Sequence, residues 1–316
     1  MKQMICSLVP NQDVKSYFLV VDAPQVRKSK RGTDYATLEL VDASGKIDAR
    51  LWEIPAALEL KWLKRAIVKV EGQTSEWEGK LQVTISKIRL VCDDDHADMD
   101  LGDFFEASPF DPDTMWEELL HIVDMNIVNE KVLTLIRKVL LQNEANFKRA
   151  PAAKHVHHAY IGGLLEHVLD MCKVAIPICE NYGLSTDLVL AGCVLHDIGK
   201  CFELTYDFGI GYSVSGSLIG HIGQGVMMVY EAIDKVDGFP QQMKVAIMHL
   251  ILSHHGSTSW GSPRVPLMRE AIALHLTDML SSKMGICARV LKSGVDDEGF
   301  TEWCRELEGR LWQIEQ

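Results

Sequence analysis

The sequence has 316 residues, with 32 Lys and Arg against 44 Asp and Glu, which gives a formal net charge of −12. Hydrophobic residues make up 47% and charged residues 24%, and these ordinary globular values exclude a disordered or fibrous chain. The length suggests two domains, each able to bury a core of its own. No apolar run approaches the roughly 18 residues that cross a bilayer, so we expect no membrane contact.

The cysteines and the N-terminus indicate where the protein works. Eight Cys are scattered through apolar patterns without any CxxC pair, which is typical of thiols in a reducing compartment rather than of disulfides or zinc knuckles. The first residues lack the apolar stretch of a signal peptide. We therefore expect a soluble, cytoplasmic protein.

Charge is divided unevenly along the chain. Residues 1–92 contain 15 basic and 11 acidic residues, a balance of +4, whereas the remainder has a balance of −16. A mildly basic module beside an acidic one is consistent with a nucleic-acid handle attached to a metal-binding domain.

Residues 1–92 have the pattern of a small all-β domain. Runs of β-branched, aromatic or alternating residues predict five strands, with a short helix over 54–62 between the third and the fourth. Five strands with a helix at that position are the plan of an oligonucleotide-binding (OB) barrel. The expected strands cover 17–21, 35–41, 46–52, 66–71 and 81–90.

A linker and a helical domain follow. Residues 93–113 contain nine acidic residues and no Lys or Arg, and Pro109 and Pro112 lie near the end of this stretch, which predicts a solvated acidic linker. From Thr114 the hydrophobic period is helical, so residues 114–316 are expected to form an all-α domain. The expected helices cover 115–126, 130–143, 163–181, 186–197, 217–234, 241–253, 265–283 and 298–312.

Histidines are concentrated in the helical part. Ten of the twelve His fall between residues 155 and 275, several of them in apolar helices that also contain acidic residues. Burying so many imidazoles and carboxylates is costly unless a cation pairs with them, and these groups are the usual ligands of divalent metals. The pattern therefore predicts a metal cluster, for which an imidazole-rich, thiolate-free site suits Mn, Fe, Co, Ni or Zn alike.

The order of these residues resembles a known family. His167, His196-Asp197 and Asp278 match the H…HD…D signature of the HD-domain metal-dependent phosphohydrolases. The fuller pattern, together with the OB module in front of it, resembles the YhaM-type 3′→5′ exoribonucleases over nearly the whole chain. That pattern comprises Pro151-Ala-Ala-Lys-His-Val-His-His158, Gly163-Leu-Leu-Glu-His167, Leu195-His-Asp-Ile-Gly-Lys200, Gly220-His-Ile222, Leu252-Ser-His-His-Gly256 and Trp260-Gly-Ser-Pro263.

The resemblance implies an all-α HD core that hydrolyses phosphodiesters with one or two divalent ions per site, Mn²⁺ being favoured over Fe, Co, Ni, Zn or Mg. Asp197 would bridge two ions, and Lys200 would offset negative charge on the attacked phosphate. The implied ligands are His167, His196, Asp197 and Asp278 for one ion, with His221, His254 and His255 for a second.

The sequence departs from the family pattern after the last ligand. The family is expected to read Asp-Asn-Leu-Asp-Ala-Lys there, whereas this chain reads Asp278-Met-Leu-Ser-Ser-Lys283. The replacements at Met279 and Ser281 put in doubt any supporting role for those two positions.

Aromatic and basic residues of the first domain are candidates for binding a single strand. Aromatic side chains on a barrel face stack on bases, and basic side chains follow the backbone. The basic run 27–31 is expected in the loop between the first two strands, although Trp52 in the barrel core and a merely solvated basic loop are an equally good interpretation. The candidates are Arg27, Lys28, Lys30, Arg31, Tyr35, Arg50, Trp52, Trp77 and Lys80, with Arg264 in the second domain.

Three functions are compatible with the sequence. The leading one is an exoribonuclease that releases nucleoside monophosphates from the 3′ end of single-stranded RNA, and DNA as a substrate is left open. The second is a phosphohydrolase of small or cyclic nucleotides with a regulatory OB domain. The third is a non-catalytic nucleic-acid-binding protein, against which the complete ligand set argues. The sequence also leaves open whether copies of the chain assemble into a homo-oligomer.

Overall fold

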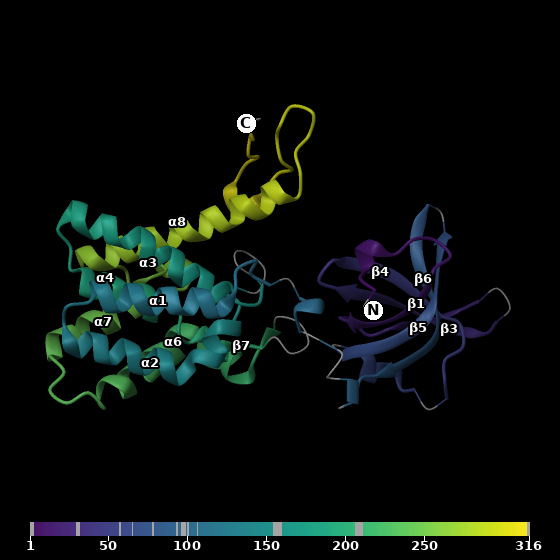
Figure 1. Ribbon diagram of the computed structural model, residues 1–316, viewed down its shortest axis with the longest axis horizontal. Helices are drawn as coiled ribbons and strands as arrows, with labels where there is room; N and C mark the ends of the chain where they lie inside the picture. The colour runs from purple at the N-terminus through teal and green to yellow at the C-terminus, as the bar shows by residue number, and fades with distance from the viewer. Residues whose placement is uncertain are drawn as a thin grey trace. The chain divides into compact units, whose positions relative to one another are not determined.

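The computed structural model describes residues 3–29, 32–56, 58–64, 66–77, 79–92, 94–95, 99, 101–105, 107–153, 160–205 and 211–314. These residues form two compact units, the first ending at Phe105 and the second beginning at Ala107. Figure 1 shows the first unit as a β-barrel and the second as a bundle of helices. None of the described helices has both the length and the apolar character needed to cross a bilayer.

The first unit is a closed barrel. Its sheet has the order β1-β5-β6-β4-β3-β2, and β1 also pairs with β3 at Leu19 and Val41, which closes the sheet on itself. The pairing of β4 with β6 is parallel, and the other pairings are antiparallel. The predicted OB barrel is thereby confirmed, with β2 as an additional strand at the edge. The strands are β1 (Asp13–Val20), β2 (Gln25–Lys28), β3 (Asp34–Asp42), β4 (Gly45–Leu51), β5 (Ala66–Trp77) and β6 (Lys80–Leu90).

Alternation of apolar and polar residues explains the barrel core. Along β3, Ala36, Leu38 and Leu40 point inward and are buried, while intervening residues are more exposed. The helix predicted over 54–62 is wrong, because the described residues there contain only the 3₁₀ turn Leu60–Leu63, which buries Leu63 in the barrel. Pro55 disfavours helical geometry at the residue before it, so the chain cannot begin a helix at Ile54.

The acidic segment after the barrel is not uniformly solvated, as predicted. Asp95 is buried and forms ion pairs with Arg89 (2.6 Å) and Lys69 (3.2 Å), and Tyr17 Oη donates to it at 2.9 Å. Phe104 and Phe105 are also buried. This part of the segment therefore belongs to the first unit.

Asp95→Asn should destabilise the barrel unit at neutral pH. Hydrogen bonds from the Arg89 guanidinium and the Cys92 amide hold the pKa of Asp95 well below its usual range. A lowered carboxyl pKa stabilises the fold above the unfolded value of about 4, and that contribution is lost as the pH falls below it. Thermal unfolding should show a lower melting temperature for the variant at pH 7 and a narrowing difference below about pH 4. Equal melting temperatures at pH 7 would contradict the assigned role.

The second unit is helical, with one small hairpin. Helix α4 is its central element, since it packs against α2, α3, α7 and α8, and all of its residues from Val189 to Leu195 are buried. Its elements are α1 (Pro112–Asn126), α2 (Glu130–Arg149), α3 (Gly163–Tyr182), α4 (Thr186–Leu195), α5 (Lys200–Glu203), β7 (Leu204–Thr205), β8 (Gly211–Tyr212), α6 (Val214–Ile233), α7 (Gln241–Ser253) and α8 (Arg269–Lys292).

The helix predicted over 298–312 is wrong. The segment folds back on itself instead, with isolated bridges from Phe300 to Trp312 and from Cys304 to Gly309 around a 3₁₀ turn at Arg305–Leu307. Gly299 adopts a left-handed conformation (φ +83°), which an L side chain would disfavour, and the chain reverses there rather than continuing as a helix.

Candidate metal centre

Seven imidazole and carboxylate side chains meet at one place in the helical unit. They come from five helices or from the turns that follow them, so residues far apart in the sequence become neighbours. All seven residues predicted as metal ligands lie in this cluster. They are His167 on α3, His196 and Asp197 after α4, His221 on α6, His254 and His255 after α7, and Asp278 on α8.

The end of α4 brings two of these groups into the interior. This helix is apolar on all faces, and its α-helical hydrogen bonding ends at His196, whose Nδ1 lies 3.0 Å from the Cys193 carbonyl oxygen. The chain then turns through Gly199 into α5. A Cβ at Gly199 would collide with the backbone oxygen of His221, so glycine at this position allows α6 to approach Asp197 closely.

One group of ligands lies between α3, α4 and α8. His167 Nε2 is 3.3 Å from Asp278 Oδ1, and His196 Nε2 is 3.2 Å from Asp197 Oδ2. Two atoms that each bind the same ion at about 2.1 Å lie about 3.0–3.4 Å apart, depending on the coordination geometry. The separations are therefore those of ligands around a common ion.

A second group adjoins the first on the other side of Asp197. His221 Nε2 and His254 Nε2 lie 3.5 and 3.6 Å from Asp197 Oδ1, and His255 joins them within the same cluster. The two oxygens of Asp197 thus face different histidines. This arrangement suits a carboxylate that bridges two ions.

The buried atoms at the centre are short of hydrogen-bond partners. Among the described residues, none makes a hydrogen bond to Nε2 of His196, His221 or His254, or to Asp197 Oδ1, although all four atoms are buried. Buried polar groups without partners cost free energy, and a cation between these atoms would satisfy all of them at once. The nitrogen and oxygen donors fit a divalent metal ion.

Protonation also favours metal binding. Burial and the neighbouring His196 hold the pKa of His254 well below its usual value, so this imidazole is neutral at pH 7. Burial alone would raise the pKa of Asp197, but Lys200 and His196 outweigh it and lower that pKa well below the usual range. Neutral imidazole and ionised carboxylate are the forms that bind metal ions.

Lys200 lies beside the bridging carboxylate. Its Nζ is 2.5 Å from Asp197 Oδ2, and its side chain is largely buried. One turn separates the two residues, so α5 holds the ammonium group at the edge of the centre.

The barrel unit carries a separate aromatic and basic face. The rings of Tyr35 and Trp52 stack with centroids 4.6 Å apart, and the Arg50 guanidinium lies 6.0 Å from the Trp52 ring and 5.6 Å from the Trp77 ring. Trp52 and Trp77 are 43% and 56% exposed, so neither is a core residue. Lys80 lines a pocket with Arg50 and Trp77.

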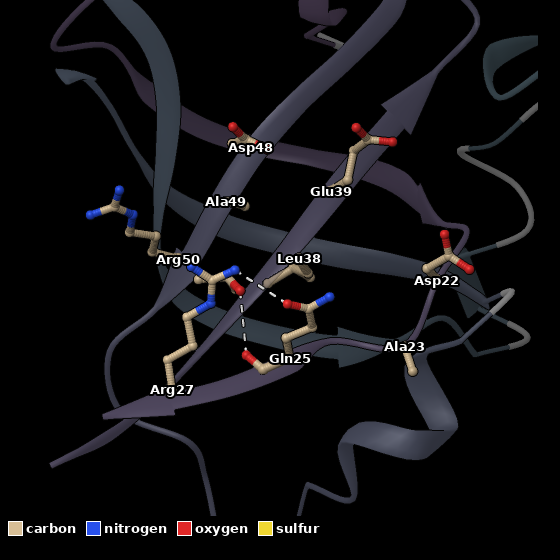
Figure 2. Close-up of a pocket in the computed structure, with 10 residues that line it drawn as sticks. Asp22, Ala23, Gln25, Arg27, Leu38, Glu39, Asp48, Ala49 and Arg50 are labelled. Carbon is tan, nitrogen blue, oxygen red and sulfur yellow. Dashed lines mark hydrogen bonds between the residues drawn. The ribbon is translucent and has the colours of Figure 1, made fainter. Parts of the chain in front are cut away.

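A groove of about 370 Å³ continues this face along β2, β3 and β4. Figure 2 shows Arg27 and Arg50 near one end, with Gln25 bonded to Arg27 (3.2 Å). Three carboxylates, of Asp22, Glu39 and Asp48, lie away from the two arginines. The positive charge is thus confined to one part of the groove, next to the aromatic side chains.

Other predicted contacts fall in different places. Arg27 and Lys28 belong to strand β2 rather than to the predicted loop, because they pair with Tyr35 and Asp34 of β3. Lys30 and Arg31 lie outside the described residues. Arg264 is exposed, and its backbone N–H donates to the Leu252 carbonyl at 3.2 Å.

Comparison with known proteins places this geometry in a family. The HD domain model matches residues 164–283, a range that contains all seven clustered ligands, while the TraI_2 helicase model covers residues 114–191 and ends before His196. The 3′-5′ exoribonuclease YhaM of Halalkalibacterium halodurans is 34% identical over 94% of this chain and 91% of its own length. YhaM of Bacillus subtilis is 33% identical over 95% of this chain and 94% of its own length.

The chain belongs to the YhaM family. Its helical unit is a metal-dependent HD domain preceded by an OB barrel. Among solved structures, the second OB-fold domain of replication protein A from Methanococcus maripaludis is similar, with 27% identity, coverage of 29% of this chain and 95% of that domain, and a TM-score of 0.25.

Three residues that support the centre of this YhaM-family chain were not assigned that role from the sequence. Ser281, whose role was in doubt, places its Oγ 3.0 Å from His167 Nδ1. The carbonyl oxygen of Trp260 lies 3.0 Å from His255 Nδ1, and Glu203 contacts His221. A buried acid three residues after Lys200 was the one available signal; the carbonyl of Trp260 leaves no signature in the sequence.

Proposed function

We propose that this protein is a divalent-metal-dependent exoribonuclease that shortens single-stranded RNA from its 3′ end and releases nucleoside monophosphates. The observation that carries the proposal is the cluster of seven ligands on two sides of Asp197, in a chain that matches the YhaM exoribonucleases over nearly its whole length. The OB barrel supports a polynucleotide substrate rather than a free nucleotide.

The residues divide the work as follows. His167, His196 and Asp278 would hold one ion, His221, His254 and His255 a second, and Asp197 both. Bound ions supply an activated water and stabilise charge on the phosphate oxygens. Lys200, already beside Asp197, places its ammonium group where it offsets charge that develops on the scissile phosphate. The apolar helices α3 and α4 keep the ligand side chains in fixed orientations.

The face formed by Tyr35, Arg50, Trp52 and Trp77 would hold the strand upstream of the cleaved end. Exposed aromatic rings stack on bases of any sequence, and arginines contact the backbone. Arg27, Lys28 and Lys80 extend the positive charge on the same unit. Lys30, Arg31 and Arg264 are proposed as further phosphate contacts. The ring faces do not distinguish ribose from deoxyribose, so single-stranded DNA is a second substrate to test.

A substrate panel tests this function against its alternatives. The protein with Mn²⁺ is incubated with 5′-labelled and 3′-labelled oligoribonucleotides, the matching DNA, deoxynucleoside triphosphates and cyclic nucleotides. The proposal expects the 5′ label to appear in a ladder of shortening products and the 3′ label to appear at once in mononucleotide. Hydrolysis of the small nucleotides alone would favour a small-nucleotide phosphohydrolase, and no hydrolysis at all would favour a binding protein.

His221→Ala should reduce the amount of bound metal from two ions per chain to one. The substitution removes a ligand that lies on only one side of Asp197, so the first ion keeps its ligands. Metal analysis of wild-type and variant protein, loaded separately with Mn²⁺, Fe²⁺, Co²⁺, Ni²⁺, Zn²⁺ and Mg²⁺, measures the ratio and the preferred metal, for which we propose Mn²⁺. An unchanged ratio with unchanged activity would return His221 to a purely packing role.

We also propose that two copies of the chain associate through α8. This helix exposes apolar side chains at four-residue spacing, a ridge that packs against an identical ridge across a twofold axis. A second copy is the favoured occupant because the ridge is uncharged, whereas two chains of net charge −12 repel each other elsewhere. The ridge consists of Ile272, Leu276, Leu280 and Met284.

Light scattering tests this association. Wild-type protein should show twice the mass of one chain, and Leu276→Glu should show the mass of one chain, because it places four charges of the dimer in the apolar contact if paired with Leu280→Glu and two if alone. Val245→Glu, at an exposed apolar residue of α7, is the control and should remain dimeric. A monomeric wild-type protein would contradict the proposal. The free state of all eight cysteines supports a reducing, cytoplasmic setting.

A further inference from the structure

The ligand histidines are oriented by contacts at Nδ1, and the contact at His221 differs in kind from the others. A histidine that binds a metal through Nε2 commonly donates its Nδ1 proton to an acceptor, and this acceptor fixes both the tautomer and the orientation of the ring. Four of the Nδ1 partners are uncharged, whereas Glu203 is a carboxylate. The partners are Ser281 Oγ for His167, the carbonyl oxygens of Cys193, Ile251 and Trp260 for His196, His254 and His255, and Glu203 for His221.

Glu203 holds His221 at two points. Its Oε1 accepts from the His221 backbone N–H at 3.0 Å, and Oε2 and Oε1 lie 3.1 and 3.2 Å from Nδ1. The carboxylate is buried at the end of α5. Gly220 breaks the helical conformation of α6 with φ +73° and ψ 161°, and the His221 amide that follows this kink donates to the carboxylate. Sequence and geometry thus converge on one contact.

We propose that Glu203 is a positioning residue for the second metal ion, the one held by His221, His254 and His255. This inference rests on the proposed two-ion centre. Glu203 keeps the ring proton on Nδ1, so the lone pair of Nε2 points toward Asp197 Oδ1, 3.5 Å away. A carboxylate partner also makes the imidazole a stronger ligand than a carbonyl partner does. The second ion therefore depends on Glu203, whereas the first does not.

An isosteric substitution separates this role from simple packing. In Glu203→Gln the amide oxygen can still accept from the His221 N–H, and the volume is unchanged. The amide NH₂ then faces Nδ1 and donates to it, which favours the tautomer with a proton on Nε2, and that tautomer cannot bind metal. Glu203→Asp keeps an acceptor that receives the Nδ1 proton. Ser281→Ala is the matched control, because it removes the uncharged partner of His167 on the other side of Asp197.

Calorimetric titration of the metal-free full-length variants with Mn²⁺ tests the proposal, with His221→Ala identifying which binding event belongs to the second ion. Glu203→Gln should weaken the second event about 10- to 100-fold and leave the first and the melting temperature unchanged. Glu203→Asp should bind the second ion more tightly than the Gln variant, and Ser281→Ala should weaken only the first event. An unchanged second event in Glu203→Gln, or equal weakening of both events, would overturn the role of Glu203. A wild-type protein with a single binding event would instead contradict the two-ion centre, and this inference with it.

Discussion

Asp197→Asn should lower the rate of RNA hydrolysis at least about 1,000-fold. Charge stabilisation by bound metal is worth several kcal/mol, and each 1.36 kcal/mol corresponds to about a tenfold change in rate. Asp197 is the group that faces both sets of histidines, so a neutral amide weakens both halves of the centre. The substitution also leaves the largely buried Lys200 without its anionic partner. Single-turnover hydrolysis of a 5′-labelled oligoribonucleotide measures the loss.

Two controls keep this result specific. Asp170→Asn, on α3 one turn beyond His167, should retain wild-type activity, because Asp170 is exposed and not among the clustered ligands. Binding of single-stranded RNA by the Asp197 variant should remain close to that of the wild type, since the barrel face is unchanged. Activity within tenfold of the wild type, with both ions still bound, would remove Asp197 from the mechanism.

The double substitution Trp52→Ala and Trp77→Ala should raise KM for long single-stranded RNA by roughly 30-fold or more. Each base stacked on an aromatic ring contributes about 1–3 kcal/mol, and both rings are exposed on the barrel face. The kcat/KM for a dinucleotide or a small chromogenic phosphodiester should change little, because such substrates need only the metal centre and Lys200. Steady-state kinetics on the long and the short substrate measure the split.

Trp303→Ala is the matched control for this pair. Trp303 is 67% exposed in the C-terminal segment of the helical unit, away from the barrel sheet, so its removal should leave both kinetic constants unchanged. In addition, Arg50→Ala should reduce the slope of binding affinity against salt concentration by about one counterion. If the double variant degrades long RNA as well as the wild type, the barrel is not a substrate handle and the small-nucleotide function gains support.

Periodicity and residue type were sufficient to predict most of the fold. The alternation in β3 and the all-round apolar character of α4 have direct physical consequences, because each pattern can bury its apolar residues in only one way. The prediction failed where local contacts override the pattern. Residues 298–312 have a helical period, yet Gly299 and the bridges around Arg305–Leu307 turn the segment back on itself.

The metal ligands were predictable for a different reason. Buried His and Asp in apolar helices are costly without a cation, so their presence signals a site even before the helices are placed. The groups that orient the ligands give no such signal. Ser281 is an ordinary polar residue in sequence, and the Trp260 contact uses a backbone carbonyl, so only the packing of α8 and of the loop after α7 reveals them.

The central claim is that Asp197 joins two divalent ions held by histidines from five helices and the turns that follow them. Anomalous diffraction from crystals of Mn²⁺-loaded wild-type protein, collected on either side of the manganese edge, tests it most directly. The account predicts two anomalous peaks, both beside Asp197, one near His167 and Asp278 and the other near His221 and His254. Crystals loaded at saturating Mn²⁺ that show no peak within the cluster would contradict it.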